Sequence, residues 1–234
     1  MYQDLAEYYD EIYSYKDYAA EAGKVIALIK SNLKTGGNKL LDAACGTGKH
    51  IGYFKQHYDV TGVDISDKML GLAKERYPDV QFHQADMMNM KLGRDFDVLV
   101  CLFSSIAHLK TYKNLNKALK NFSRHLKKGG VLIIEPFIEP DKYIAGALFA
   151  DMVNRPELKI TRMNISKRKK DIATLDFHWL IGTPKNISYY RDRHEVGLFD
   201  IEKFKKLMAE AGFDAAFLKD GLLKDRGLFL GIKN

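Results

Sequence analysis

The residues best suited to chemistry in this sequence lie in a short stretch, 40–50, where an apolar run turns into a glycine loop. Two leucines lead to Asp42, and two alanines and a cysteine then lead to Gly46 and Gly48. Glycine tolerates positive φ and lets a ligand approach the main chain closely. The amides that begin the following helix point toward such a ligand and carry partial positive charge. The stretch therefore predicts a loop that holds a ligand against the main chain.

Three classes of ligand are bound by a strand, a glycine loop and a helix in this order. A P-loop needs the pattern G-x-x-x-x-G-K-[ST], which is absent here. The dinucleotide pattern G-x-G-x-x-G is matched only in part, because the third glycine, Gly52, falls one residue late. The third class is the nucleoside cofactor S-adenosylmethionine, whose D-x-A-C-G-T-G motif the sequence resembles. A tight turn without a ligand explains such a loop about as often, so the residues further along the chain decide.

Acidic residues follow the next two predicted strands. Asp64 lies 18 residues after Gly46 (64 − 46), where a carboxylate can accept hydrogen bonds from both hydroxyls of a ribose. A helix cap is the alternative role for Asp64, but Ser66 and the residue after it can provide that cap. Asp86 can accept from an adenine amino group, while the amide that follows it donates to a ring nitrogen. NAD binding does not need an acid at position 86, so these signals together favour S-adenosylmethionine.

A histidine and two serines follow the fourth predicted strand. We expect Ser104, Ser105 and His108 to face the reacting end of the cofactor. A sulfonium methyl is already activated, so the enzyme must align a neutral lone pair with it and exclude water; orientation can contribute up to about 7–11 kcal/mol. An amine must first lose a proton, and imidazole, with a usual pKa of about 6.5, can accept it. We assign that role to His108, with a positioning histidine that takes no proton as the alternative.

The elements that must position these residues alternate between strand and helix. The predicted helices cover residues 4–13, 18–33, 50–57, 66–77, 115–126 and 201–211. The predicted strands cover residues 39–41, 60–63, 80–83, 96–102, 131–135, 215–219 and 227–232. The alternation predicts an α/β fold with a doubly wound, Rossmann-like sheet of seven strands. The last two strands are expected to be an antiparallel pair, and ligands are expected at the carboxyl ends of the parallel strands.

The pattern changes between Phe137 and Leu198. Residues 158–166, 172–181 and 187–196 alternate in polarity and are rich in β-formers, with turn signals between them. We predict an antiparallel β insertion after the fifth strand that forms a wall of the substrate pocket, with a stabilising flap as the alternative. The predicted core is then 1–136 and 198–234, with 1–35 as a helical lid, and 137–197 is a substrate or oligomerisation subdomain.

Composition limits the remaining possibilities. The chain has 234 residues with 46% apolar content, enough for one sizeable core. It has no apolar run of about 18 residues and begins with a polar, acidic stretch, so neither a membrane span nor a secretory signal is expected. Cys45 and Cys101 suggest no disulfide, and the histidines lack metal-ligand spacing, so we predict a cytoplasmic protein without a metal. The net charge of +7 fits a nucleic-acid binder, an acidic substrate or a lysine-rich surface. Because the basic residues are dispersed, we expect no nucleic acid as partner.

The sequence resembles the class I S-adenosylmethionine-dependent methyltransferases over nearly its whole length. It is most similar to the N,N-dimethyltransferases that act on nucleotide-linked 3-amino-deoxysugars, in the biosynthesis of macrolide sugars such as desosamine and mycaminose. The stretches that carry the resemblance include 41–48, 83–87, 103–109, 135–136 and 226–229. In that family the histidine that matches His108 lies beside the substrate amine, and aromatic residues near the N-terminus close over the cofactor.

The resemblance implies a cofactor, a substrate and residues that bind them. The cofactor would be S-adenosyl-L-methionine, released as S-adenosyl-L-homocysteine, and the acceptor would be the amine of a nucleotide sugar. A diphosphate favours arginine's paired donors, and Arg226 is the first candidate, followed by Arg191 and Arg193. The alternatives are an O- or C-methyltransferase on another small molecule and a nucleic-acid-binding or nucleic-acid-methylating protein. The inserted strands could also join two copies of the chain in a homodimer.

The candidate residues fall into two groups besides the catalytic His108. The cofactor-binding candidates are Tyr9, Tyr13, Ala44, Gly46, Gly48, Asp64, Ile65, Met69, Asp86, Met87 and Leu102. The substrate-binding candidates are Tyr2, Tyr18, Ser104, Ser105, Arg191, His194 and Arg226.

Overall fold

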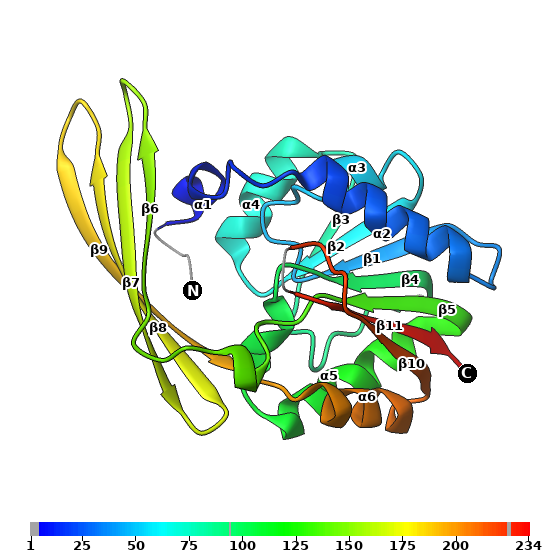
Figure 1. The fold of residues 1–234 in the computed structure, drawn as a ribbon. Coiled ribbons are helices and arrows are strands. Elements are labelled where there is room, and N and C mark those ends of the chain that lie inside the picture. The colour runs from blue at the N-terminus through cyan, green and yellow to red at the C-terminus, as the bar shows by residue number, and fades with distance from the viewer. Residues whose placement is uncertain (1–4, 94, 224–225) are drawn as a thin grey trace.

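Alternating strands and helices build a seven-stranded sheet in the computed structural model, which describes residues 5–93, 95–223 and 226–234 (Figure 1). The strands stand in the order β10-β11-β5-β4-β1-β2-β3. Their bounds are β1 Lys39–Ala43, β2 Asp59–Asp64, β3 Gln81–Gln84, β4 Phe96–Cys101, β5 Leu126–Ile134, β10 Phe213–Leu218 and β11 Leu228–Lys233. Strands β1 to β5 run parallel, while β11 is antiparallel to both β5 and β10. The predicted doubly wound sheet with an antiparallel last pair is confirmed.

Helices cover both faces of this sheet. Figure 1 shows α2 (Tyr18–Asn32), α3 (Ile51–Phe54) and α4 (Asp67–Arg76) on one side, and α5 (Tyr112–His125) and α6 (Ile201–Glu210) on the other. Their apolar residues form two separate cores, one around Phe54 and the other around Phe122 and Phe204. A side-chain oxygen caps the first turn of four of these helices, from Asp17, Ser66, Thr111 and Asp200.

Several boundaries differ from the sequence prediction. Helix α3 spans only 51–54 instead of 50–57, and β5 begins at Leu126 instead of residue 131. The basic and glycine residues expected to end α5 therefore lie inside β5. A β-carbon on Gly130 would lie 2.9 Å from the carbonyl oxygen of Asp97, so glycine allows β5 to pass close to β4 there. The 3₁₀ helix η1 (Ser105–Leu109), which carries His108, was not predicted.

The inserted region forms a second, four-stranded antiparallel sheet. It consists of β6 (Leu148–Asn154), β7 (Lys159–Lys169), β8 (Ile172–Gly182) and β9 (Ile187–Gly197), paired in chain order. The sequence predicted the last three strands but not β6. A short 3₁₀ helix, η2 (Pro140–Lys142), precedes this sheet.

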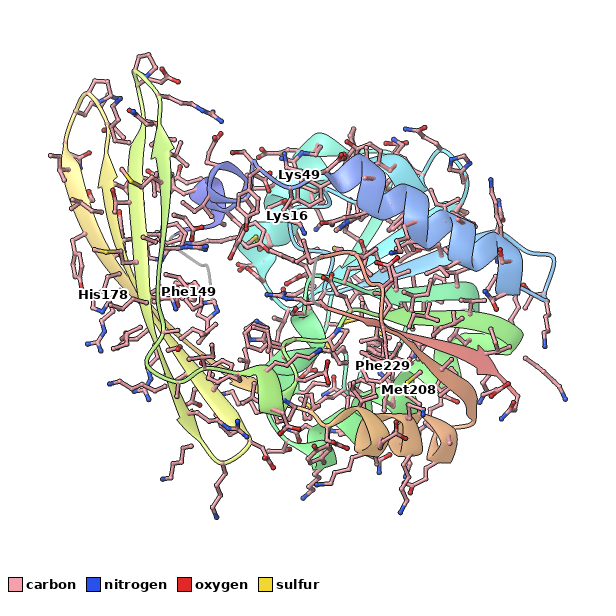
Figure 2. All side chains as sticks on the ribbon, viewed as in Figure 1. Lys16, Lys49, Phe149, His178, Met208 and Phe229 are labelled. Atoms are coloured by element: carbon pink, nitrogen blue, oxygen red, sulfur yellow. The ribbon has the colours of Figure 1, made fainter. Side chains whose placement is uncertain are left out.

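The two faces of the inserted sheet have different surroundings. Figure 2 shows Phe149 pointing toward the core domain and His178 pointing away from it. We call the face that carries Phe149 the inner face and the face that carries His178 the outer face. Successive side chains of a strand alternate between the two faces. On the inner face Ile160, Arg162 and Trp179 are buried. The outer face carries exposed apolar side chains, namely Leu148, Met152, Met163, Ile165, Leu180, Ile187 and Tyr189.

The N-terminal helix α1 (Ala6–Ile12) lies between the inserted sheet and the core sheet (Figure 1). Leu5, Ile12 and Tyr13 pack with Phe177 and Trp179 of the inner face in one apolar cluster. No helix of the described residues is long and apolar enough to cross a membrane.

Candidate active site

The glycine loop after β1 leaves its main chain open to a ligand. Gly46 and Gly48 have φ values of +57° and +79°, which favour glycine. A β-carbon built on Gly46 would meet no atom within 4 Å, so the space beside this residue is empty. The amide of Cys45 donates to the carbonyl of Val63 at 2.9 Å and holds the loop against β2.

Asp64 links the loop to the ends of β2 and β3. Its Oδ2 accepts from the amide of Gly46 and its Oδ1 from the amide of Ser66, both at 2.9 Å. Each oxygen keeps a further lone pair that can accept from a ribose hydroxyl. Burial raises the pKa of Asp64, while the backbone hydrogen bonds oppose that rise. The amide of Ala85 donates to the Asp64 carbonyl at 3.0 Å, which brings the turn of Asp86 beside Asp64.

A pocket lies beside this loop. Its lining residues are Tyr9, Tyr18, Asp42, Ala44, Cys45, Gly46, Thr47, Lys49, His50, Leu102, Phe103 and Ser105. Four of the predicted cofactor residues, those at 9, 44, 46 and 102, are among them. Tyr18 and Ser105, which we had assigned to the substrate, line the same pocket.

Asp42 is a lining residue that the sequence reasoning did not include. Its carboxyl is 3% exposed, and burial, together with the nearby Asp64, raises the pKa of Asp42 to about 7. A cationic ligand in the pocket would stabilise its ionised form. The signal that could have found Asp42 is the one that found Asp64, an acidic residue near the end of a buried strand.

The backbone is strained where β1 and β4 end at this pocket. Ala44, Phe103 and Ser104 have φ values of 61°, 51° and 61°, which are uncommon for residues with a side chain. Such strain persists only where the surrounding structure holds it, and it concentrates at functional sites. The amide of Phe103 is held by a short hydrogen bond of 2.6 Å to the carboxylate of the buried Glu135 at the end of β5.

The N-terminal segment closes over the pocket. The rings of Tyr13 and Phe103 meet edge to face with centroids 4.8 Å apart, and Tyr9 packs on both. Asp10 accepts a hydrogen bond from Thr47 Oγ1 at 2.6 Å and forms an ion pair with Arg76 of α4. Burial raises the pKa of Tyr9 well above its usual range. Of the N-terminal tyrosines, Tyr9 and Tyr18 line the pocket, whereas Tyr13 packs on Phe103 and on the inserted sheet. Tyr2 lies outside the described residues.

A buried chain of charged groups supports this closure. Lys16 Nζ lies 2.5 Å from Glu21 Oε1, and Glu21 Oε2 lies 2.8 Å from Nε2 of His50. The Lys16 ammonium also lies 4.1 Å from the centre of the Phe103 ring. Figure 2 shows Lys16 and Lys49 close to the N-terminal end of α2. The sequence reasoning used none of these groups, since lysine and glutamate pairs are usually exposed.

His108 lies on η1, directly beyond the strained turn after β4. Its neighbours Ile106 and Ala107 are fully buried and anchor this short helix. Burial lowers the pKa of His108 to about 4, and the nearby His194 contributes to the decrease. The ring is therefore a neutral imidazole at neutral pH.

His194 reaches His108 from the inserted sheet. The two ring centres are 5.6 Å apart, and His194 also contacts the ring of Phe177. Nε2 of His194 lies 2.6 Å from Oδ2 of Asp192, two residues earlier on β9. The site thus contains a residue, Asp192, that the sequence reasoning did not single out.

The two predicted arginines lie in different places. Arg226 Nη1 donates to Ser104 Oγ at 3.0 Å, and the guanidinium lies 5.3 Å from the Phe137 ring centre. Arg191 lies on the outer face of β9, where it pairs with Asp176 at 2.6 Å and its side chain is 58% exposed. The structure brings Arg226 and Ser104 together. It places Arg191 and also Arg193, which is opposite Asp176 in the strand register, on the outer face and away from the pocket.

The remaining predicted residues surround the loops after β2 and β3. Ile65 is 60% exposed at the end of β2, whereas Met69 is buried in α4. Met87 packs against the core cluster beneath α5. In the part of the chain that the structure describes, no group of three or more His, Cys, Asp or Glu side chains could hold a metal ion.

An arginine of the inner face was also missed. Arg162 has a side chain that is 6% exposed and forms an ion pair with Asp151 at 2.5 Å. Its Nη1 donates to the hydroxyl of Tyr13 at 2.8 Å, and its guanidinium lies 4.8 to 5.2 Å from the ring centres of Tyr13, Phe177 and Trp179. Arg162 therefore joins the N-terminal segment to the inserted sheet.

Comparisons with known proteins agree with this geometry. A family model described as a methyltransferase domain matches residues 40–130. The dTDP-3-amino-3,4,6-trideoxy-alpha-D-glucopyranose N,N-dimethyltransferase of Streptomyces venezuelae is 36% identical over 237 residues, covering 99% of each chain. The crystal structure of Streptomyces venezuelae DesVI matches with a TM-score of 0.92 and 35% identity, covering 98% of each chain. The structure of SAM-bound CalS10, an amino pentose methyltransferase from Micromonospora echinaspora, matches with a TM-score of 0.84 and 31% identity, covering 94% of this chain and 92% of that one.

Proposed function

The chain belongs to the class I S-adenosylmethionine-dependent methyltransferases, in the group of the dTDP-amino-sugar N,N-dimethyltransferases, and we propose from this membership that it methylates the amine of a nucleotide-linked amino sugar. The relative from Streptomyces venezuelae matches over 99% of the chain, so the similarity includes the inserted sheet as well as the cofactor domain. The substrate class therefore transfers to this chain as a hypothesis about the whole molecule.

The pocket fits S-adenosylmethionine by the chemistry of its own residues. Gly46 leaves open space beside the loop, and Asp64, which accepts from the Gly46 amide, keeps acceptor capacity for a ribose. Asp42 supplies a buried carboxyl that a positive charge would ionise. We assign the binding of the cofactor to these residues, with Tyr9 and Tyr18 closing the pocket. When bound, the cofactor supplies a methyl group activated by a sulfonium.

The observation that carries the proposal is the buried, neutral imidazole of His108, on the short helix η1 whose first residue, Ser105, lines the pocket. A base whose pKa is about 4 cannot hold a proton taken from an alcohol, whose own pKa is far higher. An amine reaches its reactive form by losing one proton near neutral pH. Its N–H can then donate to the unprotonated ring nitrogen of His108, which orients the amine and leaves its lone pair available. His108 therefore favours nitrogen over oxygen as the methyl acceptor.

Arg226 is the group that we assign to the diphosphate of the substrate. Its guanidinium has five donors in a planar arrangement that suits phosphate oxygens, and one of them is directed to Ser104. The Phe137 ring below the guanidinium holds its plane in position. Ser104 in turn donates to the carbonyl of Pro136, so both residues are fixed before a substrate arrives.

The test is a transfer assay with dTDP-linked 3-amino and 4-amino sugars, hydroxyl sugars of the same type, and S-adenosylmethionine. Mass spectrometry of the products should show one or two methyl groups on the amino sugars and none on the hydroxyl sugars. The His108→Ala variant should lose about 10²-fold in kcat while its affinity for S-adenosylmethionine stays unchanged. Methylation of the hydroxyl sugars alone would contradict the proposal.

We also infer that two copies of the chain associate through the outer face of the inserted sheet. Met163 and Leu180 lie at its centre and are 53% and 51% exposed. The charged groups on this face form their own pairs, such as Arg191 with Asp176, so two copies can meet without unpaired charges. The exposed apolar side chains of this face suit a second protein surface better than a small ligand.

Light scattering can test this association. The wild type should have twice the mass of one chain, and Met163→Glu or Leu180→Glu should reduce it to one chain. Lys169→Glu, a charge change at the exposed hairpin end of β7, is the matched control and should remain a dimer. A monomeric wild type would contradict the inference.

A further inference from the structure

We propose that Asp192 and His194 of β9 carry away the proton that His108 accepts, so that the inserted sheet completes the acid–base machinery of the methyl transfer. This inference rests on the proposed function and extends it to residues of the insert. Two independent contacts support it, the approach of the two imidazoles and the hydrogen bond behind the second one.

The three side chains form a line from the cleft toward solvent. The ring centres of His108 and His194 are 5.6 Å apart in an edge-to-face arrangement. A small rotation of either ring, or one water, brings their nitrogens into hydrogen-bond contact. His194 is 4% exposed at its side chain and Asp192 is 18% exposed. The last member of the line is therefore the one that water reaches most easily.

The hydrogen bond between His194 and Asp192 sets the direction in which a proton can pass along these side chains. A carboxylate can only accept, so Nε2 of His194 carries the proton at the 2.6 Å contact with Oδ2 of Asp192. Nδ1 of His194 is then the nitrogen that can receive a proton from His108. The carboxylate also stabilises a positive charge on the ring that it faces. Among the charged groups around His108, Lys110 and His194 oppose a positive charge on it, and Asp192 favours one.

The contact between β9 and η1 fixes this arrangement. Lys110, at the end of η1, pairs with Glu195 of β9 at 3.0 Å. A β-carbon on Gly197 would lie 2.9 Å from the Lys110 carbonyl, so only glycine lets β9 approach η1 so closely. His194 is held between these contacts and the ring of Phe177.

The reaction produces a proton that needs such a route. The amine lone pair forms the new N–C bond, the C–S bond breaks with its electron pair left on sulfur, and the nitrogen then carries one proton in excess. That proton passes to a ring nitrogen of His108, then to Nδ1 of His194, while the Nε2 proton moves to Oδ2 of Asp192 and on to water. His108 and Asp192 return to their starting forms, whereas His194 is left with its proton on Nδ1. Loss of that proton to water and return of one to Nε2 restores the starting tautomer of His194 before the next transfer. A second methylation of the same nitrogen releases a second proton by the same path, and the closed N-terminal segment limits its direct escape.

The experiment compares Asp192→Asn and His194→Gln with the matched control Arg193→Gln, which removes the charge of a neighbouring side chain on the opposite face of β9. With an amino-sugar nucleotide as acceptor, the expected loss of kcat is about 10²-fold for His194→Gln and about tenfold for Asp192→Asn, with little change in KM. The acid limb of the kcat profile should shift in both variants. Arg193→Gln should behave as the wild type does.

A second measurement does not depend on turnover. In the resting protein, the NMR titration of His108 should move to higher pH in His194→Gln, because a repelling neighbour is gone. It should move to lower pH in Asp192→Asn, because an attracting charge is gone. Unchanged titrations, or kcat and pH profiles equal to those of Arg193→Gln, would overturn the relay. A wild type that methylates no amine would instead refute the proposed function, and the titrations would still decide whether the three groups are coupled.

Discussion

The two sheets of this protein bury their strands in different ways. Every residue of β4 in the core sheet is buried, and helices cover both faces of that sheet. In β9 of the inserted sheet burial alternates along the strand: residues 188, 190 and 192 are half-buried and 194 and 196 are buried, whereas 187, 189, 191 and 193 are exposed. A strand covered on both faces can present functional groups only where it ends. A strand covered on one face can present them at every second residue.

The candidate active site lies where the edge of the first sheet meets the inner face of the second. Asp64 and His108 belong to the ends of core strands and the turns that follow them, while Arg162 and His194 lie within strands of the insert. We therefore expect changes at the core edge to act on cofactor binding. Changes on the inner face should act on the acceptor, the proton and the N-terminal segment.

The largest expected effect tests the core edge. Asp64→Ala removes a carboxylate that holds the Gly46 amide and that we assign to the ribose hydroxyls. Hydrogen bonds to a charged group contribute about 1.5–3 kcal/mol each, so loss of two should weaken S-adenosylmethionine binding by roughly 10²- to 10⁴-fold. Isothermal titration calorimetry measures the affinity, and the inner-face variant His194→Gln should bind the cofactor as the wild type does. Comparable losses of cofactor affinity in both variants would contradict the distinction between the edge of the core sheet and the inner face of the inserted sheet.

The core edge could be predicted from sequence because its signals are local. Gly46 and Gly48 follow a buried run directly, and Asp64 and Asp86 each follow another strand. Parallel strands bring their carboxyl ends to one edge, so order along the chain was enough to place these residues together. His108 was placed at the same edge because it follows the fourth strand, although its 3₁₀ helix was not predicted.

The inner face was predicted only in part because its signals are not local. Strand β6 is an edge strand with large exposed residues on both faces, such as Leu148 and Phe149, so its sequence lacks a clear alternation. Arg162 sits among polar and basic residues that read as solvent-exposed, and its partner Tyr13 is 149 residues away in the chain. Arg191 and His194 are close in sequence, yet an odd separation along a strand places them on opposite faces.

The next expected effect is on the pH dependence of stability, and it tests the junction between the edge of the core sheet and the inner face of the inserted sheet. Burial between the two keeps the pKa of folded His108 at about 4, whereas the unfolded ring titrates near its usual value of about 6.5. Between these values the unfolded chain binds a proton that the folded chain does not, so stability is lost as pH falls through this window. When the pH falls from about 7 to about 4, the free energy of unfolding should decrease in both proteins. The decrease should be smaller for His108→Asn than for the wild type, by up to about 3 kcal/mol.

Urea unfolding at several pH values measures this difference, and the histidines other than His194, which is coupled to His108, contribute equally to both proteins. Parallel stability curves for His108→Asn and the wild type would show that His108 is hydrated in the folded state. The junction between the two sheets would then be open to solvent, and the proton would need no relay.

The smallest expected effect tests the inner face alone. Tyr13→Phe removes only the hydroxyl that accepts from Arg162, and Arg162 keeps its ion pair with Asp151. The loss of one such bond predicts a decrease of about 1 kcal/mol in the free energy of unfolding and a rise of a few-fold in the KM for the acceptor. Cofactor affinity should change little, because Asp10 still holds the segment to the glycine loop. Tyr8→Phe, in the same N-terminal segment, is the matched control. If Tyr13→Phe changed the cofactor affinity more than the acceptor KM, Tyr13 would act with the core edge rather than with the insert.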